Sequence, residues 1–113
     1  MSLVQSRLEN NICLINLEGE VNQKSIEQII AIADEMRKEI ELRGVIINFK
    51  EMNYIDSIGI GMLMQLFKDF QSWQVKLAFC HLSDSLCEYF SMSFIDTVIS
   101  IHSTEEEALA SFA

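Results

Sequence analysis

The stretch GVIINFKEMNYIDSIGIGMLMQLFKDFQSW, residues 44–73, decides the fold of this 113-residue chain. Its first part, VIINF at 45–49, is nearly all apolar and rich in β-branched residues, which is the pattern of a central strand buried on both faces. After a break at 50–57, apolar residues recur at helical spacing: Met62, Leu63, Leu66, Phe67, Phe70 and Trp73. The stretch therefore predicts a buried strand, a loop and an amphipathic helix.

A serine hydroxyl lies where this helix is predicted to start, because Ser57 directly follows Asp56 at the end of the loop. A helix start offers backbone N–H groups and the positive end of the helix dipole, and both favour a phosphate group. Phosphorylation would add about −1.5 to −2 charge units, enough to expel a partner surface that closes over the serine. Since Asp and Ser are also common helix caps, a purely structural role is the alternative.

The first part of the chain predicts a hairpin and a helix. Weak alternation at residues 3–7 and an apolar run at 12–17, ending in a turn at 18–20, indicate two antiparallel strands. From Ser25 onward apolar residues follow three- and four-residue spacing, with Gln28 completing a capping box and Gly44 as the expected stop. An amphipathic helix is therefore expected between the hairpin and the central strand.

The last part of the chain alternates strands and helices again. Strands are predicted at 75–80 and 97–101, and a short helix capped by Ser83 is predicted at 83–91. Thr104 with Glu107 forms the capping box of a terminal helix, whose acidic first turn is most simply a solvated helix start that complements the dipole.

This order predicts an α/β fold: a mixed, mainly parallel sheet of four to five strands with about four helices and an opening β-hairpin. With no proline and no Gly/Ser-rich linker, residues 1–113 are expected to form a single domain. Sites in such sheets form at the carboxyl ends of the parallel strands, where the 50–57 loop must lie. The topology and the serine motif therefore predict the same location.

Composition excludes several classes of function. A formal charge of −9, from 17 acidic and 8 basic residues, opposes direct binding to nucleic acid or to an anionic membrane. No apolar run approaches the roughly 18 residues of a membrane span, so membrane insertion is not expected. Three cysteines without paired spacing indicate reduced thiols and a cytoplasmic protein. A partner surface is expected to be basic or apolar.

The strand at 45–49 followed by MNYIDSIGIGML at 52–63 resembles the STAS domain, the fold of bacterial anti-sigma factor antagonists. The resemblance spans nearly the whole chain, from the opening strands through EGEVN at 18–22 to the C-terminal helix. In that family a free-standing domain binds an anti-sigma factor that is also a serine kinase. Phosphorylation of the serine ends the binding, and a serine phosphatase restores it.

By this resemblance Ser57 is the phosphoacceptor, Asp56 is the aspartate before it, and Gly59 is the glycine that lets the helix begin close to its neighbours. The family's docking surface would then include Asn22, Asp56, Ile58, Gly59, Ile60 and Met64. Two positions depart from the common pattern. Ile58 stands where a small residue is usual, and Asn22 stands where the first loop commonly carries Asp, so recognition by a kinase is more affected than the fold.

Without phosphorylation, the same resemblance implies a constitutive STAS interaction or scaffold subunit of a signalling or transport complex. Association with other STAS proteins and self-association are both left open. Met52 and Met64 are the methionines best suited to an adaptable apolar docking patch.

Catalytic, metal and cofactor sites are not expected. A thiol–imidazole site would need Cys80, His81 and Cys87 to meet, but cysteines at a strand end and in a helix are more typical of a core. The GIG sequence near the helix start lacks the third glycine and the Gly-Lys-Ser/Thr of a phosphate-binding loop. No histidine or second carboxylate lies at metal-ligand spacing from Asp56. The sequence therefore predicts a binding protein and not an enzyme.

Overall fold

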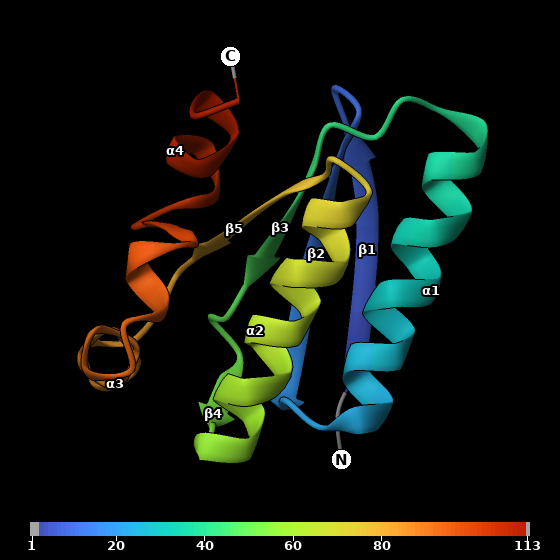
Figure 1. Ribbon diagram of the computed structural model, residues 1–113. Helices are drawn as coiled ribbons and strands as arrows, with labels where there is room; N and C mark the ends of the chain where they lie inside the picture. Colours follow the sequence, from blue (N-terminus) through green and yellow to red (C-terminus); the bar gives the residue numbers. More distant parts are fainter. Residues whose placement is uncertain (1–2, 113) are drawn as a thin grey trace.

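Strands and helices alternate along the chain in the computed structural model, which describes residues 3–112 and, at position 53, the backbone only (Figure 1). The strands are β1 (Leu3–Glu9), β2 (Ile12–Glu20), β3 (Gly44–Asn48), β4 (Met52–Tyr54), β5 (Lys76–Cys80) and β6 (Ser100–His102). The helices are α1 (Gln23–Glu39), α2 (Ser57–Ser72), α3 (Asp84–Met92) and α4 (Glu105–Ala110), with a 3-10 turn η1 (Ile95–Thr97).

The strands form one mixed sheet in the order β1-β2-β3-β5-β6, and β4 pairs with the end of β2 outside this path. β1 runs antiparallel to β2, whereas all other pairs are parallel. The predicted mixed, mainly parallel α/β sheet with an opening hairpin is therefore confirmed. β3 lies at the centre of the sheet, as its continuous apolar sequence predicts.

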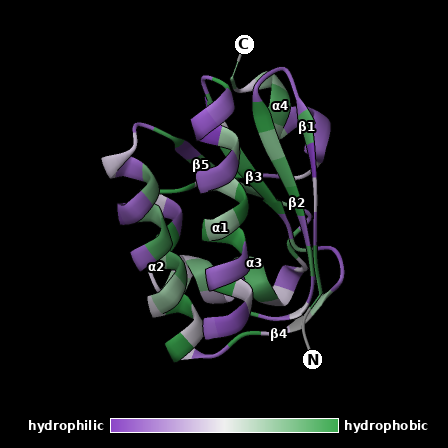
Figure 2. Cartoon of the chain, turned by 90° about the vertical axis from the view of Figure 1, so that its right-hand side faces the viewer, coloured by the Kyte–Doolittle hydropathy of each residue, from purple (hydrophilic) through white to green (hydrophobic). Residues whose placement is uncertain are grey.

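The helices divide unequally between the two faces of the sheet. Figure 2 shows α1 and α2 side by side on one face, and α3 adds its buried residues to the same core. Ile15, Ile47 and Phe79 of the strands meet Ile29 of α1 and Leu63 of α2 in this core. Each such side chain contributes about 1.5–3 kcal/mol by leaving water, so this face supplies most of the stability.

Among residues 3–112, α4 is the helix that covers the opposite face. Ala108 of α4 and Phe112 beyond it pack on Ile12, Ile46 and Ala78 of the strands, in a much smaller second core. Because α4 has only six residues, it covers part of this face, and a hollow lined by Asn16, Asn48 and Glu105 lies beside it.

The start and the end of α1 differ from prediction. Asn22, and not Ser25, caps the helix: the Asn22 Oδ1 accepts a hydrogen bond from the Ser25 N–H at 2.9 Å, and the Asn22 N–H donates to the Ser25 Oγ at 3.0 Å. Ser25 is fully buried, so it serves as the third helical residue of the capping box. The helix ends at Glu39, and four residues separate it from Gly44, which begins β3. Gly44 is needed for packing, since a Cβ there would collide with the Phe112 ring.

Three further boundaries are corrected by tertiary pairing. The predicted turn at 18–20 is wrong, because β2 continues to Glu20, where the Gly19 N–H donates to the Glu51 carbonyl at 3.2 Å. The expected loop at 50–57 contains the short strand β4, because Met52 and Tyr54 pair with Gly19 and Glu20 of β2. The strand expected at 97–101 begins only at Ser100, after the η1 turn. Within residues 3–112, no helix combines the length and apolar character that crossing a membrane requires.

Candidate functional site

The start of α2 presents Ser57 at the surface. Asp56 caps this helix: its Oδ1 accepts a hydrogen bond from the Gly59 N–H at 2.8 Å, and its carbonyl accepts one from the Ile60 N–H at 3.0 Å. Ser57 is therefore the first helical residue, exposed to solvent, and within residues 3–112 its hydroxyl makes no hydrogen bond. The hydroxyl is free for chemistry because the neighbouring carboxylate performs the capping.

Gly59 allows α2 to start close against the junction of β2 and α1. A Cβ at this position would lie 2.7 Å from the Ile55 Cγ1 and 3.4 Å from the Val21 carbonyl oxygen. Val21 directly precedes the cap of α1, so the amino-terminal ends of α1 and α2 lie at the same end of the molecule, beside β4 (Figure 1). Two helix starts and the carboxyl end of β2 meet here, as expected for an α/β site.

The residues expected to form the docking surface fall into three groups by exposure. Ile58 is 68% exposed and Asp56 is exposed, whereas Met64 and the α1 cap Asn22 are half-buried. Gly59 and Ile60 are buried, so a partner cannot contact them without rearrangement of the helix start. The expectation that Ile60 lies on the surface is corrected, because helical spacing turns its side chain into the core with Leu63.

One exposed aromatic residue at this end was not predicted. Tyr54, at the end of β4, is 61% exposed. Its place in a predicted loop beside the motif was the available signal, but its exposure depends on the pairing of β4 with β2. We call Tyr54, Asp56, Ser57 and Ile58 the Ser57 surface. Met52, expected on the surface, is buried beneath it in the main core.

The cysteines are poorly placed for nucleophilic chemistry. Burial raises the pKa of the Cys13 thiol to about 11. Burial, followed by the nearby charges of Glu105 and Glu106, raises the pKa of the Cys80 thiol to about 12. Both thiols therefore stay protonated near neutral pH and are poor nucleophiles. Among residues 3–112, no three His, Cys, Asp or Glu side chains lie close enough together to hold a metal ion.

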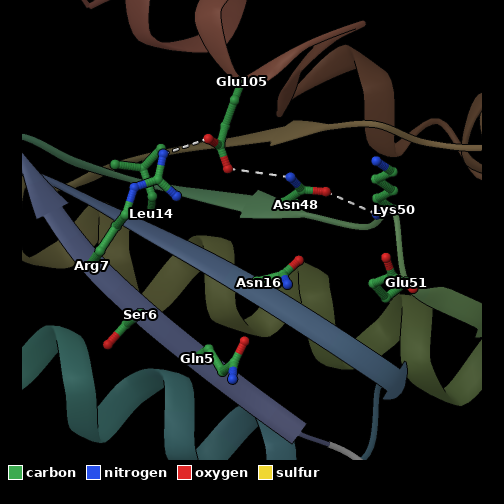
Figure 3. Close-up of a pocket in the computed structure, with 9 residues that line it drawn as sticks. All are labelled: Gln5, Ser6, Arg7, Leu14, Asn16, Asn48, Lys50, Glu51 and Glu105. Carbon is green, nitrogen blue, oxygen red and sulfur yellow. Dashed lines mark hydrogen bonds and ion pairs between the residues drawn. The ribbon is translucent and has the colours of Figure 1, made fainter.

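A polar hollow of about 490 Å³ lies on the other face of the sheet, next to α4 (Figure 3). The register of β1, β2 and β3 aligns three amide side chains across its floor, from Gln5 through Asn16 to Asn48. Sequence analysis missed this hollow. The available signal was Asn at 16 and 48 inside two apolar strands, because Asn is depleted in strands.

The charges around this hollow are mostly satisfied within the protein. The Arg7 Nη2 donates to the Glu105 Oε1 at 2.6 Å, and the Asn48 Nδ2 donates to the Glu105 Oε2 at 3.2 Å (Figure 3). The Asn48 Oδ1 accepts from the Lys50 N–H at 2.9 Å. Chiefly because of the Arg7 hydrogen bond, the pKa of Glu105 is lowered. This network links the start of α4 to β1 and β3, so its role is structural, and the Ser57 surface is the stronger candidate site.

Comparison with known proteins agrees with the architecture described above. The family model of the STAS domain matches residues 4–108. BtrV of Bordetella bronchiseptica, provisionally named an anti-sigma factor antagonist, is 25% identical over 114 residues that cover 99% of this chain and 95% of BtrV. The anti-sigma F factor antagonist of Paenibacillus polymyxa is 18% identical over 106 residues, covering 94% of this chain and 91% of that protein.

Solved structures of an anti-sigma factor antagonist have the same fold. The unphosphorylated form of SpoIIAA is 21% identical and superposes with a TM-score of 0.68, covering 96% of each chain. The phosphorylated form of SpoIIAA from Bacillus is 21% identical with a TM-score of 0.69, covering 98% of this chain and all of the other.

Proposed function

The chain belongs to the STAS family of anti-sigma factor antagonists, and we propose that it binds an anti-sigma factor while Ser57 is unmodified and releases it when Ser57 is phosphorylated. In this proposal the partner is itself the serine kinase, and a separate serine phosphatase restores binding. The protein is a regulated binding module without catalysis of its own. The observation that carries the proposal is the free hydroxyl of Ser57 at an exposed helix start.

The helix start offers a place for the phosphate. In the first turn of α2 the N–H groups of Ser57 and Ile58 have no carbonyl partner within the helix. Both are directed toward the amino-terminal side, where a phosphate on Ser57 would lie. The Asp56 carboxylate already holds the Gly59 N–H, and its negative charge would repel the phosphate. The phosphate is therefore expected at the outer edge of the turn, facing the partner.

The unmodified surface suits an apolar or mixed contact. Ile58 follows Ser57 directly and Tyr54 precedes it by three residues, and both are largely exposed, so a partner can bury apolar area near a small neutral hydroxyl. A phosphate on Ser57 would be buried under such a partner as an unpaired charge, at a cost of several kcal/mol. Since about 1.4 kcal/mol is a tenfold change in affinity, this cost is enough to end binding.

Release does not require a change of fold. The phosphorylated and unphosphorylated forms of SpoIIAA superpose equally well on this chain, which supports a switch that acts through surface charge. We place this function in the cytoplasm, where ATP is available to the kinase and the thiols of Cys13, Cys80 and Cys87 stay reduced.

The test is to isolate the protein from its source organism, map phosphorylated residues by mass spectrometry, and compare the partners captured by wild type, Ser57→Ala and Ser57→Asp. Ser85 is the matched control, because it is another exposed serine in the first turn of a helix, α3. We expect phosphate on Ser57, capture of an anti-sigma factor by wild type and Ser57→Ala, and loss of capture by Ser57→Asp but not by Ser85→Asp.

The competing function is a constitutive STAS interaction subunit that is never phosphorylated. The large exposed side chain of Ile58, directly beside the hydroxyl, favours it because a kinase active site must accommodate that bulk. If Ser57 carries no phosphate and all variants capture the same STAS or scaffold partners, this function replaces the switch.

A further inference from the structure

Phe94, directly after the cap of α3, has an unusual backbone conformation for an aromatic residue. Its φ of 60° and ψ of 14° lie in the left-handed region, where glycine or asparagine is usual at the end of a helix. Within residues 3–112, the other non-glycine residues with positive φ are all polar: Asn10, Asn11, Gln74 and His81. A bulky side chain in this region is strained, so a glycine would be more stable here.

The surrounding structure holds Phe94 in this conformation. Its N–H donates to the Ser91 carbonyl at 3.1 Å, and its carbonyl accepts hydrogen bonds from the Thr97 N–H at 3.2 Å and the Thr97 Oγ1 at 2.6 Å. The next residue, Ile95, is fully buried in the main core. The turn from α3 into η1 therefore fixes the backbone, whichever side chain stands at position 94.

Burial of the Phe94 ring offsets little of this strain. Phe94 is 71% exposed, and so is Met92, while Val98 after η1 is 45% exposed. These exposed apolar residues fall within seven positions, which we call the Phe94 segment (residues 92–98). Val98 lines a hollow with Phe67 and Lys76, so the exposed pair at the end of α3 is Met92 and Phe94. Exposed large apolar side chains that are close together are typical of a surface that another molecule covers.

Charge indicates what covers it. Residues 83–101 contain three acidic residues, Asp84, Glu88 and Asp96, and no lysine or arginine, while Lys76 of β5 lines the hollow beside Val98. Asp96 within the segment and Glu88 four residues before it are both exposed. An anionic membrane or a second copy of this chain would bring like charges against these carboxylates, whereas a basic surface would be attracted.

We propose that the Phe94 segment is a docking surface for a partner segment that is apolar on one face and basic around it, such as an amphipathic helix rich in leucine and lysine. Phe94 and Met92 contact its apolar face, and Glu88 and Asp96 pair with its cations. Figure 1 shows α3 at the β5 side of the sheet, with α2 between α3 and α1. Binding here is therefore expected to be independent of the state of Ser57.

The test measures fluorescence anisotropy of a labelled Leu/Lys amphipathic helical peptide titrated with the full chain. Leu/Glu and Leu/Ser peptides of the same length serve as comparisons. Phe94→Asn removes the ring while retaining a residue that tolerates the left-handed region. Leu8→Asn is the matched control, because Leu8 is an exposed apolar residue of β1, at the opposite edge of the sheet and outside the Ser57 surface. We expect at least tenfold weaker binding for Phe94→Asn and unchanged binding for Leu8→Asn.

Several outcomes would overturn the proposal: no binding at about 1 mM, equal binding of the acidic or neutral peptide, or equal losses in both variants. A dimer that depends on Phe94 in sedimentation equilibrium would assign the segment to a second copy instead.

A measurement of thermal stability separates docking from a structural role. Phe94→Gly is expected to raise the melting temperature by several degrees, because strain is relieved and little burial is lost. A fall would show that Phe94 supports the fold.

Discussion

The Asp56 carboxylate accepts a hydrogen bond from the Gly59 N–H at 2.8 Å, which leaves the intervening Ser57 hydroxyl without a capping role. Replacement of Asp56 by Ala is therefore expected to lower the free energy of unfolding by about 1 kcal/mol. Ser57→Ala should change it by no more than about 0.5 kcal/mol, as for an ordinary surface position. Urea unfolding followed by circular dichroism measures both values.

The conservative variant Asp56→Asn serves as a control, since Asn caps a helix as well as Asp does. It should retain the stability that Asp56→Ala loses. If Ser57→Ala destabilises as much as Asp56→Ala, the serine shares in the cap. A kinase would then have to break a structural hydrogen bond to reach it.

The two glycines at the start of α2 provide a second test, because their surroundings are opposite. A Cβ at Gly59 would lie 2.7 Å from the Ile55 Cγ1, whereas a Cβ at Gly61 would have no atom within 4 Å outside its own helix. Gly59→Ala should cost about 1–3 kcal/mol through overpacking. Gly61→Ala should instead stabilise the protein by about 0.5–1 kcal/mol, since alanine favours a helix interior. Equal effects in thermal or urea unfolding would mean that α2 does not start against the junction of β2 and α1.

Reactivity of the thiols gives a third prediction. Burial raises the pKa of Cys13 to about 11 and that of Cys80 to about 12, while Cys87 is exposed on α3. Because the thiolate is the reactive form, Ellman's reagent near neutral pH should modify Cys87 alone in the folded protein. All three cysteines should react in denaturant. Cys87→Ser should abolish the fast phase, and rapid reaction of a second thiol would show that the sheet opens.

The sequence predicted those elements whose pattern is local. The apolar run of β3 and the helical spacing of α2 identify both elements, and Asp56 with Ser57 mark the junction between them. The candidate site could therefore be located from residues 45–73. Which of its residues reach the surface could not be predicted, because the burial of Ile60 and the exposure of Tyr54 depend on how α2 and β4 pack against β2.

The errors in the prediction arise from contacts between distant parts of the chain. Both Asn22 and Ser25 are good helix caps by residue type, and only the burial of Ser25 decides between them. Strand β4 has three residues and pairs with β2, about thirty positions earlier, so no local pattern marks it. The amide row at Gln5, Asn16 and Asn48 likewise exists only through strand register.

The ion pair between Arg7 and Glu105 leads to a prediction about pH. The hydrogen bond from Arg7 holds the pKa of Glu105 below its ordinary value in the folded protein. A carboxylate with a lowered pKa contributes stability above its unfolded pKa and loses that contribution as pH falls through the folded pKa. Glu105→Gln should therefore be less stable than wild type near neutral pH by about 1 kcal/mol or less, because the Arg7 side chain is largely exposed.

The difference between wild type and Glu105→Gln should shrink as pH falls below about 4.5 and vanish at still lower pH, when Glu105 is protonated in both folded and unfolded states. Unfolding free energies from urea titrations at a series of pH values test this. Glu106→Gln is the control, since Glu106 is exposed and makes no ion pair within residues 3–112. The unfolding free energy of Glu106→Gln should change with pH as that of wild type does. If the difference in unfolding free energy between wild type and Glu105→Gln stays constant from neutral to acid pH, the carboxylate charge does not hold α4 on the sheet. The stability that Glu105→Gln loses would then come from packing alone.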